Sequence, residues 1–241
     1  MYDDLDRPPL RSAALARALD PDGWHVEVVT TAPSTQELVR GRPPGSVVVA
    51  EEQTQGRGRL DRSWSSPPRA GLTFSALVRP PLVDGWIPLL AGLAVANAIS
   101  EQCELDTVLK WPNDVLVGGK KVCGLLAEVV GTDVAIGIGI NVTTREDELP
   151  YAAATSLRLA GATTTDRETL LKAVLRDLTK VLDQRPLASY RERCSTLGEQ
   201  VRVLLPGEVV VEGVAQDVDD EGRLVVDGVP YAAGDVIHLR G

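Results

Sequence analysis

Hydrophobic residues form short alternating or continuous runs along the chain, and these runs predict a sheet of several strands. Val, Ile and Leu recur at every second position or in unbroken β-branched stretches, between turns marked by Gly, Pro and Asp. Gly118 and Gly119 separate two of the runs, which is typical of a hairpin. The predicted strands are 24–30, 47–50, 72–78, 107–110, 115–117, 121–130 and 134–142.

Helical spacing of hydrophobic residues predicts helices at 8–19, 86–102, 165–182 and 187–197. The second of these is apolar on all sides, so we expect it to be buried. Ser34 with Glu37, and Thr165 with Glu168, have the spacing of a capping box. The two pairs predict helix starts at 34 and at 165.

Two regions depart from this pattern. The segment 53–70 has no apolar period and is rich in Gly, Arg, Ser and Pro, so it is predicted to be a long loop of the kind that usually carries function. After Gly198, short strands at 201–205, 208–218, 223–226 and 236–239 alternate with turns. A module of about forty residues seldom folds well alone. We therefore predict two domains, 1–197 and 198–241, packed together.

The chain is acidic, with 25 Lys and Arg against 34 Asp and Glu and a formal net charge of −9. Proteins that wrap duplex DNA usually carry a basic surplus. Only one helical segment precedes residue 24, which leaves no room there for a helix-turn-helix. We accordingly predict no DNA partner.

The cysteine and histidine counts bear on the compartment. Cys103, Cys123 and Cys194 are an odd number and widely spaced, which argues against a disulfide framework and favours a reducing compartment. The two histidines, His25 and His238, lie far apart and do not suggest a zinc site. The acidic start is unlike a signal peptide, and the apolar stretch 87–99 is too short to span a bilayer. We expect a cytoplasmic protein with no membrane partner.

A local basic segment contrasts with the acidic whole. It comprises Gly56, Arg57, Gly58, Arg59, Arg62 and Trp64. Glycine lets backbone N–H groups approach an anion, and arginine presents a planar charged fork that matches phosphate or carboxylate. The segment predicts an anion-binding loop, although a flexible basic surface loop would have the same composition. Trp64 fits either a cover for a planar base or a core residue.

A second polar cluster, Lys110-Trp111-Pro112-Asn113-Asp114, follows a predicted strand. Asp114 offers the oxygen ligands that Mg²⁺ prefers, and Lys110 can bind phosphate as a point charge. Pro-Asn-Asp is also common in ordinary turns.

Two further segments contain glycines within strands. Lys121 begins a predicted buried strand from which its ammonium can reach a pocket, whereas Lys120 fits a solvated hairpin lysine. Gly137, Gly139 and Asn141 alternate along another strand. Such glycines mark either the close approach of a ligand or tight packing.

Taken together and in this order, the motifs resemble those of the biotin protein ligases. The matching patterns are G-R-G-R…W-x-S-P at 56–67, K-W-P-N-D at 110–114, K-x-x-G-L-L-x-E at 121–128 and G-I-G-I-N-V at 137–142. Ser34-Thr35-Gln36, Gln53 and Ala154-Thr155-Ser156-Leu157 fit further segments of the family. The resemblance extends from about residue 28 to the carboxyl terminus.

The resemblance implies an α+β fold, in which a mixed β-sheet backed by helices, related to class II synthetases and lipoate ligases, precedes a small SH3-like β-barrel. It also implies a two-step reaction. The biotin carboxylate attacks the α-phosphate of ATP to give biotinyl-5′-AMP and pyrophosphate, and a lysine of a biotin carboxyl carrier domain then takes the biotinyl group as an amide. ATP and Mg²⁺ are the implied co-substrate and metal, with no prosthetic group.

The family's site residues carry over onto matching positions. The catalytic residues would be Lys121, Arg57 and Arg59. The biotin site would comprise Ser34, Thr35, Gln53, Gly56, Arg57, Gly58, Arg59, Lys121 and Gly124. The ATP site would comprise Arg59, Arg62, Trp64, Lys110, Asn113 and Asn141, with Asp114 as the Mg²⁺ ligand.

Two departures from the family pattern qualify the resemblance. Asp61 stands where many relatives have glycine, which bears on the geometry of the loop rather than on the reaction. No DNA-binding segment precedes the first strand, so the resemblance is to the ligase-only type. The alternatives are lipoate or octanoate transfer by the same fold, a biotin-responsive repressor and a non-catalytic binding module.

Overall fold

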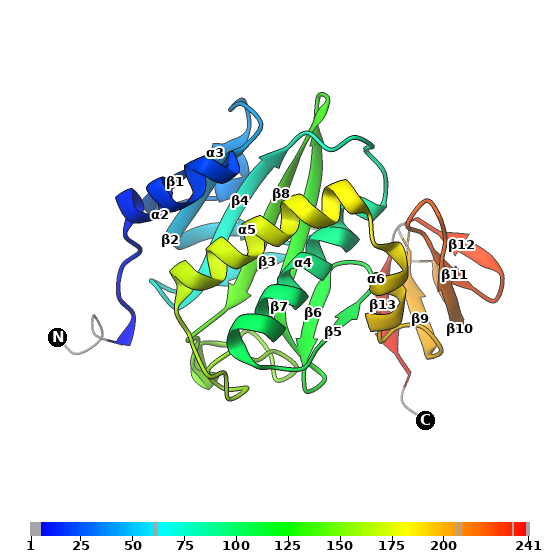
Figure 1. Cartoon of the computed structure of the whole chain (residues 1–241). Coiled ribbons are helices and arrows are strands. Elements are labelled where there is room, and N and C mark those ends of the chain that lie inside the picture. Colours follow the sequence, from blue (N-terminus) through cyan, green and yellow to red (C-terminus); the bar gives the residue numbers. More distant parts are fainter. Residues whose placement is uncertain (1–5, 60–61, 206, 208, 233, 240–241) are drawn as a thin grey trace.

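The computed structural model describes residues 6–59, 62–205, 207, 209–232 and 234–239. Within these ranges the chain forms a large mixed sheet with helices across one face and a smaller antiparallel sheet at its carboxyl-terminal end (Figure 1). This arrangement is the predicted α+β fold. In the described ranges, no helix is long and apolar enough to cross a bilayer.

The large sheet has eight strands in the order β1-β2-β4-β8-β7-β6-β5, with β3 paired to the end of β2. β1 and β2 pair in parallel, and the other pairs are antiparallel. The strands are β1 (His25–Ala32), β2 (Ser46–Arg57), β3 (Ser63–Ser66), β4 (Gly71–Val78), β5 (Thr107–Lys110), β6 (Asp114–Val117), β7 (Lys120–Val130) and β8 (Asp133–Asn141).

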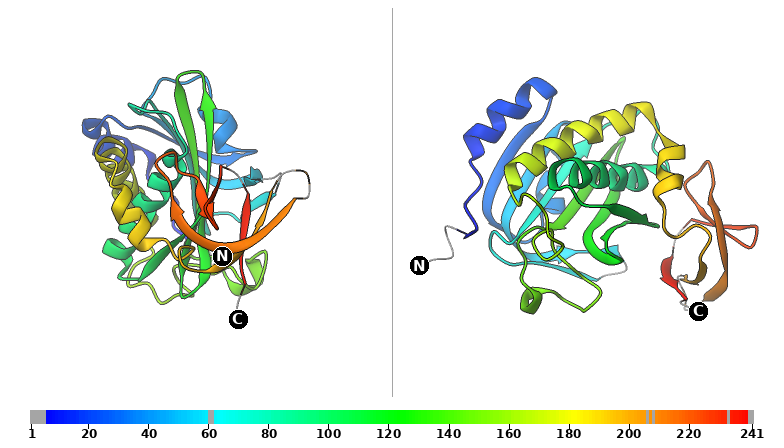
Figure 2. Two further views of the ribbon diagram at one scale, coloured as in Figure 1. Left: turned by 90° about the vertical axis from the view of Figure 1, so that its right-hand side faces the viewer. Right: turned by 60° about the horizontal axis from the view of Figure 1, so that its bottom comes forward.

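Helices α4 (Trp86–Cys103) and α5 (Arg167–Gln184) lie side by side over one face of this sheet (Figures 1 and 2). α4 packs against β5, β6 and β7 of the sheet and against α5 and α6, which explains why it is buried almost all round, as its composition predicted. The remaining helices are α2 (Ser12–Leu19), α3 (Thr35–Val39) and α6 (Leu187–Arg193), with short 3₁₀ turns at Asp20–Asp22 and Glu146–Glu148.

The two central strands, β4 and β8, send alternate side chains to different surroundings, as the pleat of a sheet requires. Phe74, Ile136 and Ile138 belong to the hydrophobic core. The intervening positions line a cavity on the opposite face; they are Thr73, Ser75, Gly137, Gly139 and Asn141. The sheet thus separates the core from the candidate site.

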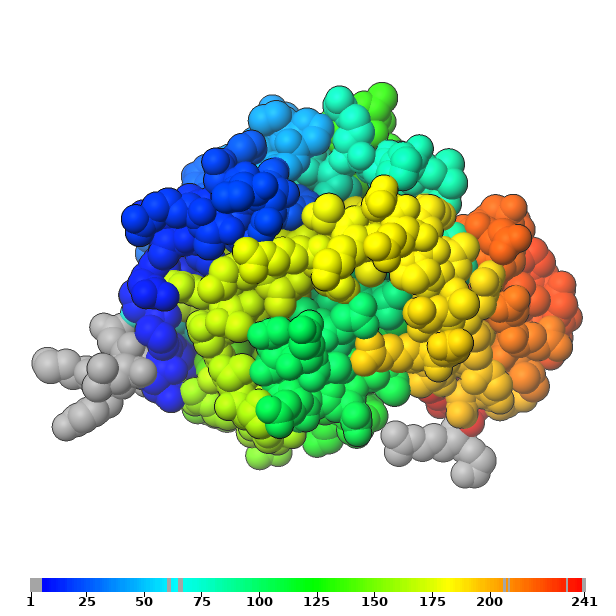
Figure 3. All heavy atoms as spheres, viewed as in Figure 1, coloured from blue at the N-terminus to red at the C-terminus, as the bar shows by residue number. Residues whose placement is uncertain are grey.

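The smaller sheet has the strand order β12-β11-β10-β9-β13. Its strands are β9 (Gln200–Leu204), β10 (Val210–Val218), β11 (Leu224–Val226), β12 (Val229–Tyr231) and β13 (Asp235–His238). Buried residues of this sheet, including Val203 and Leu224, belong to the same hydrophobic cluster as the main core. It packs beside α6 (Figure 3). The smaller sheet is therefore packed against the rest of the chain, as we expected for a module of its size.

The predicted loop at 53–70 is wrong for half of its length, because 53–57 and 63–66 lie in strands. β2 continues to Arg57, and β3 returns antiparallel to it, with Gly56 opposite Trp64 and Arg57 opposite Ser63. The sequence of the hairpin shows no apolar alternation, because the two strands are joined by backbone hydrogen bonds and one face of the hairpin borders a polar cavity. Asp61 lies outside the described residues.

Both predicted capping boxes are also wrong. Ser34 is the N-cap of α3 but its side chain makes no cap hydrogen bond. α5 begins at Arg167, and the side chain of its N-cap Asp166 accepts a hydrogen bond from the backbone of Glu168. The Glu168 carboxylate instead binds Arg11, 2.7 Å away. Competing long-range ion pairs explain why local spacing failed.

Three smaller differences concern element ends. The predicted helix at 8–19 begins only at Ser12, because the backbone N–H of Leu10 donates to the Glu51 carboxylate instead of joining the helix. The strand β12 was not predicted; a two-residue turn at Asp227 and Gly228, both with positive φ, returns the chain after β11. Position 208, the predicted start of a strand, lies outside the described residues.

The cysteines are as the sequence predicted. Cys103, Cys123 and Cys194 are buried and free. Burial raises the pKa of the Cys103 thiol to about 11, so that it stays protonated at neutral pH.

Candidate functional site

A cavity of about 840 Å³ opens on the face of the large sheet opposite α4 and α5. β4, β7 and β8 form its floor, and α3, the β2–β3 hairpin, the β5–β6 turn and β13 form its walls. The predicted site residues that line it are Ser34, Thr35, Gln53, Arg57, Gly58, Arg59, Arg62, Trp64, Lys110, Asn113, Asp114, Lys121, Gly124 and Asn141. Residues from six separate segments of the sequence therefore meet in one place.

Gly56 is the predicted residue that does not line this cavity. A Cβ atom there would lie 2.3 Å from Gln53 Nε2 and 2.3 Å from the Trp64 carbonyl oxygen. Glycine at this position lets the β2–β3 hairpin close while Gln53 folds beneath it. Its place in the structure supports the site without facing into it.

One end of the cavity is polar and uncharged. Gln53 Oε1 accepts hydrogen bonds from the backbone N–H of Thr35 (2.9 Å) and from its hydroxyl (3.3 Å). The same hydroxyl lies 2.8 Å from Ser75 Oγ. Gln36 donates to the Ala135 carbonyl (2.9 Å), and its buried Oε1 atom has no hydrogen-bond partner. Gln36 and Ser75 were not among the predicted site residues, although the sequence segment around Ser34 drew attention to the first.

The other end is cationic. Lys121 Nζ lies 2.6 Å from Asp114 Oδ1 and 5.8 Å from the centroid of the Trp64 ring. Arg62 forms an ion pair with Asp235, the first residue of β13. Arg59, beside it, is 3.4 Å from the carbonyl oxygen of Gly234, and its buried Nε atom has no hydrogen-bond partner.

The electrostatics of this end favour an anion. Burial lowers the pKa of Lys110, Asp114 opposes that shift, and the nearby charges of Lys121 and Arg62 lower the pKa further. Burial and Arg62 likewise lower the pKa of Arg59, against the effect of Asp114. Cations whose pKa is lowered by burial and by one another gain stability when a negatively charged group binds among them.

The Trp64 indole lies over the strand glycines. A Cβ on Gly139 would fall 2.3 Å from the indole ring, and one on Gly124 would fall 3.0 Å from it and 3.1 Å from Lys121 Nζ. The glycines of β7 and β8 thus admit a side chain from β3 close to the sheet. Trp64 is half-buried in the cavity wall rather than a core residue.

The two asparagines hold backbone segments at the rim. Asn113 donates to the carbonyl of Leu125 (2.9 Å), and Asn141 donates to that of Thr155 (3.0 Å). Thr155 also pairs with the backbone of Lys121, since its N–H donates to the Lys121 carbonyl at 2.8 Å. These contacts explain the structural place of the 154–157 motif: it fixes the start of β7, from which Lys121 extends.

The acidic residues of the site bear on whether it can hold a metal ion. Among the described residues, no group of three or more His, Cys, Asp or Glu side chains is placed to hold a metal ion. Asp114 is paired with Lys121, and Asp235, which also lines the cavity, is paired with Arg62. A divalent cation here would need further oxygen ligands from a bound substrate.

The smaller sheet contributes part of the wall that the sequence did not predict. Leu204, Asp235, Ile237 and His238 all line the cavity. Their positions depend on how one sheet docks against the other, and the periodicity within each strand carries no information about that docking.

The chain matches the family model for the biotin/lipoate A/B protein ligases over residues 28–144 and the model for the biotin protein ligase C-terminal domain over residues 196–239. It is 40% identical to the biotin–[acetyl-CoA-carboxylase] ligase of Mycobacterium tuberculosis, over 98% of each chain. It is 29% identical to the bifunctional ligase/repressor BirA of Escherichia coli, over 89% of this chain and 74% of that protein.

Solved structures agree with these matches. The biotin protein ligase of Aquifex aeolicus in complex with biotin and ATP superposes with a TM-score of 0.74 at 31% identity, covering 90% of this chain and 99% of that one. The ligase of Leishmania major in complex with biotinyl-5-AMP gives a TM-score of 0.63 at 26% identity, over 90% and 98% of the two chains. With its two-sheet fold and its cavity of one polar and one cationic end, the chain belongs to the biotin protein ligase family.

Proposed function

We propose that this chain joins biotin and ATP to form biotinyl-5′-AMP and then transfers the biotinyl group to a lysine of a biotin carboxyl carrier domain. The observation that carries the proposal is that one cavity has an uncharged polar end, with hydroxyl and amide side chains, and a cationic end. The first end suits an uncharged ureido ring, and the second suits a carboxylate that meets a triphosphate. Relatives whose names and structures include biotin, ATP and biotinyl-5-AMP support it.

The chemical difficulty is that both reactants are anions. The carboxylate of biotin must approach the α-phosphate of ATP, and fixed cations lower the barrier by offsetting that repulsion. Lys121 is suited to this role because its ammonium forms an ion pair with Asp114, 2.6 Å away, which orients it. Arg57 and Arg59 are proposed to act with it. The attacking groups belong to the substrates, so no side chain is needed as a nucleophile.

The biotin end is proposed to comprise Ser34, Thr35, Gln53, Gly58 and Gly124, with Gly56 as a supporting residue. Thr35 and Gln53 already bind each other through one shared oxygen. Such pre-paired groups hold their polar atoms in place before a ligand binds, which reduces the ordering cost of binding.

The ATP end is proposed to comprise Arg59, Arg62, Trp64, Lys110, Asn113 and Asn141. Trp64 would cover the base, and closure of the β2–β3 hairpin would keep water from the mixed anhydride. Mg²⁺, when bound, would offset charge on the triphosphate, with Asp114 as one ligand and phosphate oxygens as others.

We also propose a division into a catalytic domain at 1–197 and a C-terminal domain at 198–241. The change of strand pattern near Gly198 and the match of the C-terminal model to 196–239 support this boundary. A cytoplasmic location is proposed as well, which the three buried free cysteines support.

The test is a mass-spectrometric assay of biotin transfer to a purified carrier domain with ATP and Mg²⁺. Lys121→Ala is expected to lower the rate of biotinyl-AMP formation by about 10²–10³, the usual effect of removing one donor to developing negative charge. The control is Lys120→Ala, which removes the neighbouring exposed lysine and should leave the rate unchanged.

A wild-type protein that forms no biotinyl-AMP would refute the proposal. A parallel assay with lipoate or octanoate distinguishes the alternative of acyl transfer by the same fold. Thermal melting of both lysine variants shows whether any loss reflects unfolding.

A further inference from the structure

We propose that Trp111 is a positioning residue. Through it, the β10–β11 turn of the smaller sheet holds the segment Lys110–Asp114 in place at the cationic end of the cavity. This inference rests on the proposed function, because it assigns a role in that reaction. It begins from the segment itself. Lys110 and Asp114 face each other at the ends of β5 and β6, and the three residues between them form the connecting turn.

Trp111 holds the middle of this turn to the smaller sheet. Its side chain is buried, and its indole N–H donates to the carbonyl of Gly222 at 3.2 Å. Its backbone N–H donates to Thr196 Oγ1 at 3.1 Å. The Thr196 hydroxyl is in turn 3.3 Å from Nε2 of His238 in β13. Both polar hydrogens of Trp111 are therefore bound by residues that follow α6 in the chain.

Gly222 can serve as a fixed acceptor because its turn is held tightly against the start of α4. A Cβ on Gly222 would lie 2.6 Å from the carbonyl carbon of Gly85, and one on Gly85 would lie 2.4 Å from the Glu221 carbonyl oxygen. Gly222 also has a φ of +81°, a backbone conformation that residues with a side chain rarely adopt.

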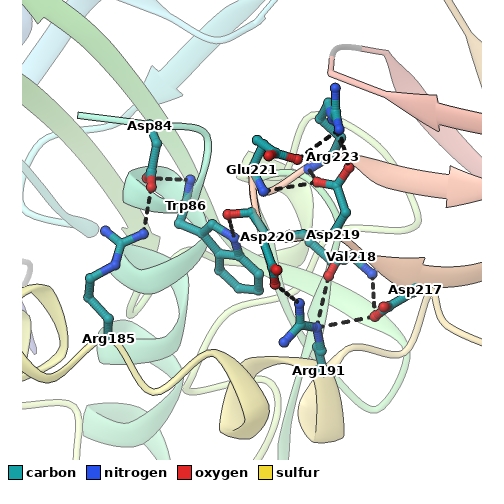
Figure 4. A network of polar contacts seen from close by, with 10 residues as sticks. All are labelled: Asp84, Trp86, Arg185, Arg191, Asp217, Val218, Asp219, Asp220, Glu221 and Arg223. Atoms are coloured by element: carbon teal, nitrogen blue, oxygen red, sulfur yellow. Dashed lines mark hydrogen bonds and ion pairs between the residues drawn. The ribbon is translucent and has the colours of Figure 1, made fainter. Parts of the chain in front are cut away.

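The side chains around this turn form a polar network (Figure 4). The Trp86 indole N–H lies 3.0 Å from the carbonyl oxygens of both Asp219 and Asp220. Arg191 donates to the Val218 carbonyl at 2.8 Å, and Arg223 forms an ion pair with Asp219 at 2.7 Å. The turn thus has several attachments besides Trp111, so its position does not depend on that residue alone.

Trp86 and Trp111 bind the same turn but differ in what else they hold. Trp86 is the first residue of α4 and lies away from the residues that line the cavity, whereas Trp111 lies between Lys110 and Asn113. Loss of the Trp86 N–H weakens the docking of the smaller sheet. Loss of the Trp111 N–H also releases the segment that carries the proposed ATP contacts.

The experiment compares Trp111→Phe with Trp86→Phe in the full chain, since each change removes an indole N–H and keeps an aromatic ring. For Trp111→Phe we expect the KM for ATP in biotinyl-AMP formation to rise by about three- to tenfold, the range that one hydrogen bond supports, with the KM for biotin unchanged. For Trp86→Phe we expect an equal or larger fall in Tm, with the KM for ATP within about twofold of the wild type.

Thr196→Val supplies a second variant that keeps the shape of the side chain and removes the acceptor for the Trp111 backbone. It should raise the KM for ATP in the same way, and it keeps the inference testable if Trp111→Phe does not fold. If the enzyme is active, the inference is overturned when Trp86→Phe and Trp111→Phe change the KM for ATP equally. It is also overturned when neither Trp111→Phe nor Thr196→Val changes the KM for ATP. A wild type that forms no biotinyl-AMP would instead overturn the proposed function and this inference with it.

Discussion

At the scale of single residues, the cations of the cavity already have acidic neighbours. Lys121 pairs with Asp114, Arg62 with Asp235, and Arg57 with Glu37 at 2.9 Å. The last pair is largely exposed, so it contributes little to stability and can yield readily to a ligand. Substrate phosphates and carboxylates must therefore compete with side-chain carboxylates for the same cations.

Lys110 offers a residue-scale prediction about pH. Its pKa is lowered from 10.5 by burial and by neighbouring cations, and bound ATP would favour its charged form. The amine is therefore protonated below its lowered pKa and loses its charge as the pH rises through that value. We expect the KM for ATP to increase on the alkaline side, beginning below pH 10.5. Steady-state kinetics of biotinyl-AMP formation across this range provide the measurement.

The control for this prediction is Lys110→Arg, which keeps the charge over the whole range. It should abolish the alkaline rise in the KM for ATP that belongs to Lys110, whatever its effect on the KM at neutral pH. An alkaline rise of the same size in this variant would assign the titration to another group.

At the scale of elements, the sequence predicted those features that the spacing of hydrophobic residues determines, namely which positions of a strand or helix are buried. The core positions of β4 and β8 follow from alternation, and the burial of α4 follows from its uniformly apolar composition. The β2–β3 hairpin was mistaken for a loop because its residues are polar, although its backbone ladder is regular. Capping at Ser34 and Thr165 failed because spacing alone does not show which distant partner a side chain will meet, as Glu168 meets Arg11.

The candidate site likewise contains residues that the sequence predicted and residues that it did not. Residues such as Lys121, Asp114 and Arg62 belong to recognisable motifs, and the fold brings them together in one cavity. Asp235 and His238 belong to strands whose sequence gives no sign of a site. They reach the cavity only because the smaller sheet docks beside it, which is a property of tertiary packing.

The glycines of β7 and β8 give an element-scale prediction. Gly139→Ala places a Cβ atom 2.3 Å from the Trp64 indole, so the ring must move away from the sheet. Displacement of this cavity wall should raise the KM for biotin or ATP by at least about tenfold, equivalent to about 1.4 kcal/mol. Steady-state kinetics and the tryptophan fluorescence of the variant provide the measurements.

Gly92→Ala in α4 is the matched control, because its Cβ would meet Leu109 at an ordinary 3.5 Å and the helix would gain a residue that favours it. We expect unchanged kinetics for that variant. If Gly139→Ala also retains wild-type KM values, Trp64 has no role in forming either substrate site.

At the scale of the whole molecule, one buried ion pair joins parts of the chain that are distant in sequence. Arg167, at the start of α5, donates to Glu51 of β2 at 2.6 Å, to the Gly71 carbonyl at 3.2 Å and to the Pro8 carbonyl at 2.6 Å. The other Glu51 oxygen accepts from the backbone of Leu10. This cluster ties the amino-terminal segment, the sheet and α5 together on the helix-covered side.

Arg167→Met should therefore lower the free energy of unfolding by about 3–5 kcal/mol, because it leaves Glu51 as a buried charge without its partner. The matched control is Arg176→Met, which removes an exposed pair with Asp22 and should cost less than about 1 kcal/mol. Urea denaturation at neutral pH measures both. Adding Glu51→Gln to Arg167→Met should recover part of the loss, since the unpaired charge is then gone. A loss for Arg167→Met no greater than for Arg176→Met would mean that Glu51 finds water or another partner, and that the cluster does not hold the amino-terminal segment to the sheet.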